Sequence, residues 1–322
     1  MTVVLEGLIG ARPWLSNEAS NLVVMTVVLA GGSGFLGRRL RAQLERDGHR
    51  VLNLTRSPRP DRAGDLAWQP DGPPEKLAPH FEGVDAIVNL AGENIAGASW
   101  SEARMARLRN SRLLATRSIV RAMTACERPA KVLISGSAVG YYGPHGDEVV
   151  TERTPPGSDF LARLCVDWEE EARAGAPSRT RLVIIRSGLV LGADGGALKK
   201  MLLPFKLGLG ATLGAGQQYM PRVHLDDWVA MVIWLIGADR ATGAFNASAP
   251  TPVTNRDFTR TLGRVLRRPA VFQAPAFVLK LSLGELSSML LTGQRVIPAA
   301  AEELGFRFTY RELEPALRSL NL

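Results

Sequence analysis

Residues near position 34 have the types and the spacing that suit contact with a phosphate group. Gly31, Gly34 and Gly37 stand at the spacing G-x-x-G-x-x-G. A backbone without side chains can turn tightly there and approach a pyrophosphate, which the N–H groups at the start of a following helix would bind. The motif therefore predicts the binding of a dinucleotide. Its expected contacts are Gly31, Ser33, Gly34, Phe35, Leu36 and Gly37.

The flanking sequence supplies the elements that this motif needs. Residues 26–30 are rich in β-branched side chains and predict a buried strand. Residues 38–47 are amphipathic and end before Gly48, which predicts a helix. Strand, glycine turn and helix thus follow in the order of a dinucleotide-binding βα unit.

The end of the next predicted strand, residues 51–55, bears on which dinucleotide is bound. An acidic residue there would bind the ribose hydroxyls of NAD, whereas a cation would bind the 2′-phosphate of NADP. The sequence has Thr55 followed by Arg56, and Arg38 comes directly after the glycine turn. Guanidinium groups suit phosphate, so the pattern favours NADP. The alternative for Arg56 is a solvated loop cation.

A third predicted strand, residues 84–90, ends at the same edge of the sheet. Its expected cofactor contacts are Leu90, Ala91, Gly92 and Glu93. Asp85, in the same segment, would hydrogen-bond the adenine amino group or would be a plain loop carboxylate.

A fourth predicted strand, residues 131–135, continues into a Ser-Gly-Ser sequence and two tyrosines. Ser137 follows this strand, where a hydroxyl could hydrogen-bond an oxygen that gains or loses charge. Its alternative is a turn residue that satisfies its own backbone. Ser135 and Tyr141 are expected to line a substrate pocket.

Five motifs resemble, in order, the landmarks of extended short-chain dehydrogenase/reductases. They are Gly31-x-x-Gly-Phe-x-Gly37, Asn89-Leu-Ala-Gly92, Ser135-Gly-Ser-Ala-x-Gly-Tyr-Tyr-Gly143, Arg186-Ser-Gly-Leu-Val-Leu-Gly192 and Val223-His-Leu-Asp-Asp227. More narrowly, the chain resembles the NAD(P)-dependent epimerase family proteins with a C-terminal domain of unknown function, some of which carry a cell-division-inhibitor label. The residues for this narrower resemblance are Ala91-Gly-Glu93, Pro204-Phe205, Gly208-Leu-Gly-Ala, Gly293-Gln-Arg295, Pro298 and Glu302-Glu-Leu-Gly-Phe306. The resemblance implies a doubly wound parallel α/β sheet of the Rossmann type with a smaller C-terminal substrate lobe.

The resemblance also implies hydride transfer beside a nicotinamide, with a Ser, a Tyr and a Lys handling the substrate oxygen. Ser137 takes the place of the Ser. The Tyr-x-x-x-Lys pair, in which the Lys lowers the pKa of the Tyr, belongs on the next helix, expected over residues 158–175. That helix has Phe160 and Leu164, or Leu161 and Cys165, at the two positions, depending on the alignment. Neither alignment restores the pair.

Two interpretations of the missing pair stay open. In the first, another group moves the proton, with Tyr142 the preferred substitute and Tyr141 and His224 the others. In the second, the fold binds the dinucleotide without the usual chemistry. Arg163 could polarise a substrate but could not act as a base. For His224 a structural role is favoured over a substrate contact, because its neighbours mark a buried strand.

The segment after residue 190 is expected to form the other wall of the site. Lys200, on a predicted helix that starts near residue 197, would bind an anionic substrate group or would be an ordinary exposed lysine. The glycine-rich residues 208–216 are a candidate lid. The resemblance allows the helices over 100–125 and 158–175 to form a homodimer contact.

Local patterns predict the remaining elements. Ser99 and Glu102 form a capping box for the helix over 100–125, and Asp226 with Asp227 would cap a helix over 228–236. Further helices are expected over 254–267, 275–291 and 312–320, and a strand over 306–310. The apolar side chains of 275–291 favour core over a dimer contact or a membrane-facing stripe.

These patterns predict a division of the chain. Residues 1–24 are expected to be a dispensable N-terminal extension, because residues 1–5 recur as 25–29 and only the second copy leads into the glycine motif. Residues 25–190 would form the NAD(P)-binding domain. Residues 191–322 would form mainly the substrate lobe, with about 223–245 returning to the first domain.

Composition limits the class of protein. With 322 residues, 46% hydrophobic and 22% charged, the chain is neither disordered nor fibrous. Its net charge of +8 is carried by cations among which acids are interleaved almost everywhere, so nucleic acid is not expected as a partner. Cys126 and Cys165 lack metal-ligand spacing, which predicts no metal site and a reducing, cytoplasmic location. No apolar run is long enough to predict an integral membrane segment.

The sequence therefore predicts an NADP-dependent oxidoreductase or epimerase that acts on a small metabolite, sugar-like or anionic. The alternative is an NADP-binding regulatory or sensor protein with little turnover.

Overall fold

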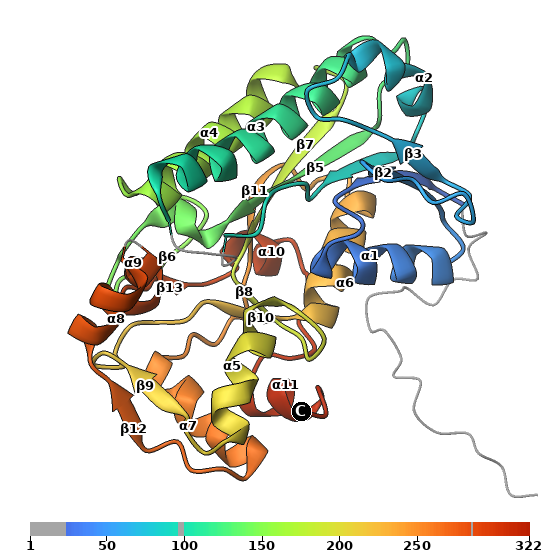
Figure 1. The fold of residues 1–322 in the computed structure, drawn as a ribbon. Coiled ribbons are helices and arrows are strands. Elements are labelled where there is room, and N and C mark those ends of the chain that lie inside the picture. The colour runs from blue at the N-terminus through green and yellow to red at the C-terminus, as the bar shows by residue number, and fades with distance from the viewer. Residues whose placement is uncertain (1–23, 96–99, 285) are drawn as a thin grey trace, which may run out of the picture.

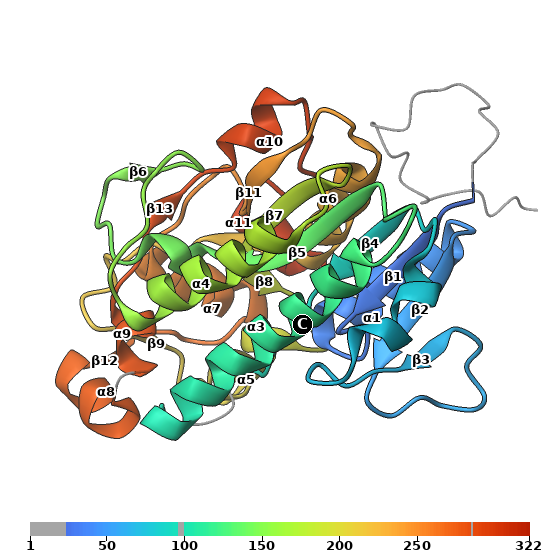
Figure 2. The ribbon, with the colours of Figure 1, turned by 90° about the horizontal axis from the view of Figure 1, so that it is seen from above.

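The computed structural model describes residues 24–95, 100–284 and 286–322. At its centre lies a seven-stranded parallel sheet in the order β11-β7-β5-β4-β1-β2-β3, with helices on both faces (Figure 1, Figure 2). The strand order changes direction between β1 and β4, and ligands of open parallel sheets bind at the carboxyl edge beside such a point. The predicted doubly wound α/β fold is confirmed.

The strands of this sheet are short and largely apolar because helices cover both faces. They are β1 (Thr26–Ala30), β2 (Arg50–Thr55), β3 (Asp65–Ala67), β4 (Ala86–Asn89), β5 (Val132–Ala138), β7 (Arg181–Ser187) and β11 (Gly243–Ala247). The parallel register pairs Ala30 with both Leu54 and Asn89. The residues that follow these three strands therefore meet at one edge.

Two helical layers enclose the sheet. One face is covered by α1 (Phe35–Arg46) and α6 (Leu225–Gly237), and the other by α3 (Glu102–Thr124) and α4 (Phe160–Gly175) (Figure 2). The short η1 (Pro74–Lys76) and α2 (Ala78–Phe81) contact α3. Each layer has its own fully buried core, around Trp228 on the first face and around Ile119 on the second.

A smaller lobe lies at the carboxyl edge and is built from three two-stranded parallel pairs and short helices (Figure 1). The pairs are β8 (Leu189–Leu191) with β10 (Arg222–His224), β9 (Ala211–Leu213) with β12 (Phe272–Ala274), and β6 (Val149–Val150) with β13 (Arg295–Val296). The helices are α5 (Gly196–Lys206), α7 (Asn255–Leu266), α8 (Ala276–Leu283), α9 (Leu286–Leu291) and α11 (Leu313–Arg318), and a short η3 (Val139–Tyr142) follows β5. Helix α10 (Ala299–Glu303) packs against β11 of the main sheet. Phe205, Phe258 and Leu317 lie in the core that α5, α7 and α11 share.

The chain returns to the main sheet before it completes this lobe. Helix α6 packs on the sheet, and β11 pairs with β7 along its whole length. The predicted division into an NAD(P)-binding domain and a substrate lobe stays a prediction. The proposed extension, residues 1–24, lies outside the described residues except for Val24.

The predicted caps of two helices are not those that the structure has. Ser101 caps α3, because its side chain accepts a hydrogen bond from the backbone of Arg104; the predicted cap, Ser99, lies outside the described residues. Helix α6 begins at Leu225, three residues earlier than predicted, and is capped by His224 rather than by Asp226 and Asp227. A His ring nitrogen can accept a hydrogen bond from a backbone N–H as a Ser or Asp oxygen does. No local sequence pattern distinguishes a His that caps a helix from one that does not.

The prediction of one buried helix over residues 275–291 is also wrong. The segment forms α8 and α9, separated at Gly284, whose φ is +55°. Phe277 is 71% exposed and Leu281 is 89% exposed. The spacing of apolar residues showed an apolar face, but whether anything covers that face depends on the tertiary arrangement.

The predicted strand over residues 306–310 is absent. The buried Asp227 carboxylate accepts the backbone N–H groups of Thr309 and Tyr310, at 2.9 and 2.8 Å. These N–H groups thus bond a side chain and do not join a sheet, while Phe306 and Phe308 both enter the core.

Candidate functional site

The glycine turn after β1 forms a tight backbone cradle. Gly31 has φ +83°, and a Cβ there would lie 2.7 Å from the carbonyl oxygen of Leu90. A Cβ on Gly37 would collide with the backbone of Gly31 and Gly32. Only glycines allow this packing of turn, helix and neighbouring strand.

Helix α1 begins at this turn with its N-terminus open. Gly34 is its N-cap, no side chain in the described ranges caps the helix, and its first turn has no acidic residue. The first N–H groups of a helix and its dipole attract anions. These groups and the glycine cradle fit a pyrophosphate.

The segment after β4 faces the glycine turn. The Leu90 N–H donates to the carbonyl of Ala30 at 2.9 Å. The Glu93 carboxylate forms an ion pair with Arg104 and lies 3.9 Å from Arg107, and its backbone carbonyl accepts from Arg112 at 3.1 Å. Glu93 is therefore held in place by arginines from α3, which offset its charge beside the cradle.

The rim of the site next to β2 is basic. Arg56 is exposed directly after Thr55, and Arg38 is exposed with its guanidinium 3.1 Å from the carbonyl oxygen of Ser33. The nearby acid, Asp65, is buried between Asn53 and Arg41. Burial alone would raise the pKa of Asp65, but hydrogen bonds from Asn53 and Arg41 lower it. Asp65 is thus occupied inside the fold, and the first exposed charge after β2 is that of Arg56.

The expectation that Asp85 contacts the adenine is wrong. Asp85 precedes β4, and its carboxylate accepts from the backbone of Thr26 and from Lys131, both at 2.8 Å. Thr26 starts β1, so Asp85 lies at the amino edge of the sheet, opposite the glycine turn. Of the two interpretations of Asp85, the plain loop carboxylate therefore agrees with the structure.

Ser137 belongs to a buried polar network below the carboxyl edge. Its hydroxyl donates to Glu169 of α4 at 2.7 Å, and Glu169 accepts two hydrogen bonds from Arg186 of β7, both at 2.8 Å. Glu169 and Arg186 are almost completely buried. Although burial opposes ionisation, the bonds from Arg186, Ser137 and Arg173 lower the pKa of Glu169. The network therefore holds a buried ion pair to which Ser137 is bound.

The expectation that Tyr142 replaces the missing proton donor is wrong. Tyr142 is fully buried, its hydroxyl donates to Asn246 at 2.6 Å, and it accepts from Arg186 at 3.0 Å. Burial raises the pKa of Tyr142 to about 12. A phenol with both partners inside the core cannot exchange a proton with a bound metabolite.

The neighbouring positions have different surroundings. Tyr141 is half-buried, and the guanidinium of Arg186 lies 3.4 Å from the centre of its ring. Ser135 is completely buried, and its hydroxyl has no hydrogen-bond partner in the described part of the chain. Ser135 is therefore not a substrate contact as predicted, whereas Tyr141 stays a candidate.

The structure favours one of the two alignments for the missing pair. Leu161 of α4 packs against Gly140, and the thiol of Cys165 lies beside Ser137 and Ala138. Burial raises the pKa of Cys165 to about 11, so the thiol is neutral. A leucine and a neutral thiol thus lie beside the end of β5, at the two positions where the resemblance implies a Tyr and a Lys.

His224 has the structural role that was favoured for it. Its Nδ1 accepts from the backbone of Asp226 at 3.1 Å, its Nε2 lies 3.2 Å from the Ser319 hydroxyl, and its ring lies 3.9 Å from that of Tyr310. Burial lowers the pKa of His224 to about 4. It ties α6 to the C-terminal segment, so the substrate contact predicted for it is wrong. Lys200 is exposed on α5, and a substrate contact for it stays a prediction.

Sequence reasoning missed three features of this region. Glu169 and Asn246 complete the network around Ser137, and Phe35 packs against Gly192, Gly195 and Gly196 of the loop between β8 and α5. A Cβ on Gly192 would lie 2.7 Å from the ring of Phe35. The helical spacing of Glu169 with Ala162, Cys165 and Ala172, which places an acid on the apolar face of the predicted helix over 158–175, is a signal that could have indicated the network.

The described ranges lack two further classes of site. No group of three or more His, Cys, Asp or Glu side chains is arranged there to hold a metal ion. No helix in the same ranges is long and apolar enough to cross a membrane.

A parallel sheet with a glycine turn and an open helix N-terminus at its switch point defines the Rossmann class of nucleotide-binding proteins. Comparison with known families is more specific. The NAD dependent epimerase/dehydratase family matches residues 27–248, and a domain of unknown function (DUF1731) matches residues 274–320. The chain belongs to this epimerase/dehydratase family, and the resemblance seen in its motifs is confirmed.

Similar proteins cover nearly the whole chain. An epimerase family protein of Mycobacterium bovis is 40% identical over 90% of this chain and 96% of its own length. The human epimerase family protein SDR39U1, crystallised with NADPH, is 36% identical, with a TM-score of 0.85 over 92% of this chain and 99% of that one. A nucleoside-diphosphate sugar epimerase of Corynebacterium glutamicum is 32% identical, with a TM-score of 0.75 over 93% of this chain and 59% of that one.

Proposed function

We propose that this protein binds NADP(H) at the carboxyl edge of the sheet, between β1 and β4. The observation that carries the proposal is the open N-terminus of α1 above a cradle in which Gly31 leaves no room for a side chain beside Leu90. The NADPH in the crystal of the human relative supports the choice of cofactor. The pyrophosphate would be held by Gly31, Ser33, Gly34, Phe35, Leu36 and Gly37, with Leu90, Ala91, Gly92 and Glu93 on the facing wall.

The choice of NADP(H) over NAD(H) would depend on the basic rim. Arg56, with Arg38 and Thr55 beside it, would bind the 2′-phosphate, since Asp65 is already paired with Arg41 and Asn53. Calorimetric titration with NADPH and NADH tests this assignment. Arg56→Asp should weaken NADPH binding by at least tenfold and leave NADH binding unchanged or improved. Arg50→Asp, at the exposed opposite end of β2, is the matched control and should change neither. Equal affinities for both nucleotides in the unmodified protein would refute the assignment.

We further propose that the bound cofactor serves regulation or sensing, with little turnover. When bound, the nicotinamide supplies a hydride donor or acceptor. Proton transfer to a substrate also needs a group of suitable pKa within hydrogen-bond reach. Tyr142 and His224 are buried with other partners, Cys165 is a neutral buried thiol, and Ser137 donates to Glu169. Of the groups considered for this step, the half-buried Tyr141 alone keeps a substrate contact open. Binding that changes how the C-terminal lobe packs on Phe35 would transmit the state of the cofactor.

The second candidate is an oxidoreductase or epimerase of a small, sugar-like or anionic metabolite. It is supported by the half-buried Tyr141 and by Ser137 at the same end of β5. NADPH consumption across a panel of such metabolites separates the two candidates. A substrate whose turnover falls at least tenfold in Tyr141→Phe or Ser137→Ala, with NADPH affinity unchanged, would establish the enzyme. Absence of consumption across the whole panel, with hydrogen exchange of residues 189–213 slowed by NADPH and not by NADP+, would support the sensor.

Two further features belong to this proposal. A homodimer through α3 and α4 would be detected by sedimentation. A cytoplasmic location agrees with the two free cysteines, Cys126 and Cys165.

A further inference from the structure

The excess of positive over negative charge in this chain lies in two segments of the C-terminal lobe. Residues 195–225 and 258–284 contain nine Lys and Arg residues and no Asp or Glu. The rest of the chain has 30 Lys and Arg against 31 Asp and Glu. Although cations occur along the whole sequence, the net charge of +8 is due to these two segments, which are less than a fifth of its length.

The same two segments expose most of the large apolar side chains. Of the thirteen exposed large hydrophobic residues in the described ranges, eight lie in them. They are Leu203, Leu207, Leu209, Val271, Phe272, Phe277, Val278 and Leu281. Single exposed apolar residues are ordinary, but a concentration of them marks an interaction surface.

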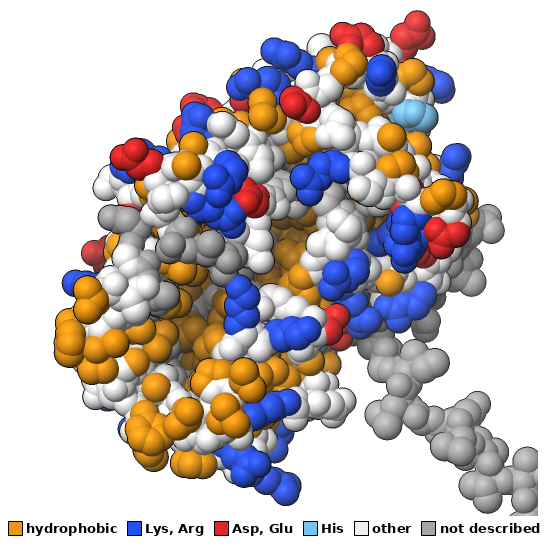
Figure 3. Space-filling model, viewed as in Figure 1, with side chains coloured by type: hydrophobic (Ala, Val, Ile, Leu, Met, Phe, Trp, Pro, Cys, Tyr) orange, Lys and Arg blue, Asp and Glu red, His pale blue; other side chains and the backbone are white. Residues whose placement is uncertain are grey.

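The two segments are neighbours in space, and their exposed residues form one surface, here called the basic apolar face. Arg222 is buried and is not part of it. Strand β9 of the first pairs with β12 of the second. A Cβ on Gly208 would lie 3.7 Å from the ring of Pro269, and one on Gly210 would lie 3.1 Å from Ala270. Figure 3 shows hydrophobic side chains gathered over the region of α8, β12 and α7, with basic side chains at its margin.

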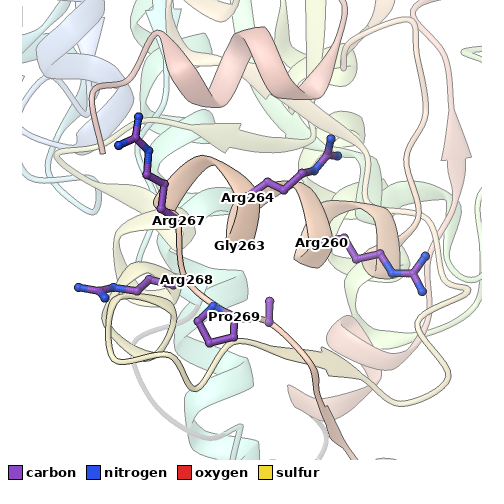
Figure 4. A pocket seen from close by; sticks show the side chains of 7 residues that line it. Arg260, Gly263, Arg264, Arg267, Arg268 and Pro269 are labelled. Atoms are coloured by element: carbon purple, nitrogen blue, oxygen red, sulfur yellow. The ribbon is translucent and has the colours of Figure 1, made fainter.

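The arginines of this face surround an open hollow of about 710 Å³ at the end of α7, lined by Arg260, Arg264, Arg267 and Arg268 with Gly263, Pro269 and Ala270. Arg264 is paired with Glu314 at 3.1 Å, whereas the side chains of the other three have no ion-pair partner among the described residues. Figure 4 shows the four guanidinium groups pointing in different directions and not toward one point. That arrangement suits an extended anionic surface better than a single small anion.

We propose that the basic apolar face binds the surface of an anionic lipid bilayer. Its exposed Phe, Leu and Val side chains would enter the headgroup region while the surrounding Lys and Arg contact lipid phosphates, the combination found in interfacial membrane proteins. A nucleic acid would be matched by the charge but not by the exposed aliphatic side chains. A second copy of this chain would bring a surface with excess positive charge, on which Glu314 pairs with Arg264, against another of the same kind, which like-charge repulsion disfavours.

Flotation of the full chain with lipid vesicles tests the proposal. Vesicles of phosphatidylcholine alone are compared with an equal mixture of phosphatidylcholine and phosphatidylglycerol, at low ionic strength and with added NaCl. We expect binding to the anionic vesicles only, weakened by salt. Arg260→Gln with Arg268→Gln should weaken it roughly 25-fold, as about fivefold per charge predicts. Phe277→Ser with Leu281→Ser should weaken it by about tenfold or more.

Matched variants elsewhere separate this surface from general charge and hydrophobicity. Arg128→Gln with Arg153→Gln removes two exposed cations outside the face, and Val149→Ser removes an exposed apolar side chain there. These should bind vesicles like the unmodified protein, and all variants should bind NADPH equally, which shows that they fold. Absence of vesicle binding, equal binding to neutral vesicles, or unchanged binding in the face variants would overturn the proposal. So would the loss of a dimer in Phe277→Ser with Leu281→Ser when no vesicle binding occurs.

Discussion

The Ser137 hydroxyl donates to the buried carboxylate of Glu169, with 2.7 Å between Oγ and Oε1. Glu169 in turn holds Arg186, which donates to the hydroxyl of Tyr142. A serine at the position expected for catalysis is therefore also part of the internal support of the sheet edge. Structural and catalytic roles can be separated only by variants that are compared for both stability and turnover.

Ser137→Ala is expected to destabilise the fold by about 1–2 kcal/mol, because it removes a hydrogen bond to a buried charge. Urea unfolding measures this cost. Ser135→Ala is the matched control in the same strand: its buried hydroxyl has no partner among the described residues, so its removal should be neutral or stabilising. Equal destabilisation by both variants would show that the bond from Ser137 to Glu169 contributes nothing.

Glu169→Gln should destabilise far more, by roughly 3–5 kcal/mol, because it leaves the buried Arg186 guanidinium without its counter-charge. Asp167→Asn, two residues away on α4, breaks the more exposed ion pair with Arg109 and should cost less than about 1 kcal/mol. The midpoints of urea unfolding give both values. Similar midpoints would mean that Glu169 is not ionised in the folded protein.

The pH dependence of stability should report His224. Burial lowers its pKa from the ordinary value of 6.5 to about 4, so between these values the unfolded chain binds a proton that the folded protein does not. The contribution of His224 to the free energy of unfolding is then complete above pH 6.5. It decreases as the pH falls toward 4, by up to about 1.4 kcal/mol per pH unit.

Urea unfolding between pH 7 and pH 4.5 measures this slope in two variants. His224→Asn keeps a side-chain acceptor for the helix cap and should flatten the slope. His80→Asn, at an exposed position, should leave it as it is. The assignment to His224 fails if both variants keep the slope of the unmodified protein.

Gly31→Ala should abolish NADPH binding, because its Cβ would meet the Leu90 carbonyl oxygen at 2.7 Å in a backbone conformation with φ +83°. Gly48→Ala provides the comparison: its φ is +84°, but no atom of the described residues lies within 4 Å of an added Cβ. Both variants carry a similar backbone strain, of about 1–2 kcal/mol. Only Gly31→Ala should therefore lose calorimetric NADPH binding, and equal affinities in the two variants would show that the close approach to Leu90 is not needed.

Local sequence was sufficient for the framework of this protein. β-Branched runs, glycine spacing and amphipathic helices are short-range patterns, and they predicted β1, β2, β4, β5, α1, α3, α4 and the glycine turn within a few residues. The family followed from motifs of the same local kind. The carboxyl edge was also predictable, because parallel strands that follow one another through helices must bring their ends to one side.

Tertiary structure alone decided what each polar side chain does. Tyr141 and Tyr142 are adjacent in sequence, yet only Tyr142 is enclosed by Arg186 and Asn246, residues 44 and 104 positions away. Asp85 lies one residue before β4, and that position placed it at the opposite edge from the cofactor cradle. The apolar face of α8 was visible in the sequence, but its exposure depends on which elements pack nearby. Burial and hydrogen-bond partners arise from contacts between distant segments, and no local pattern specifies them.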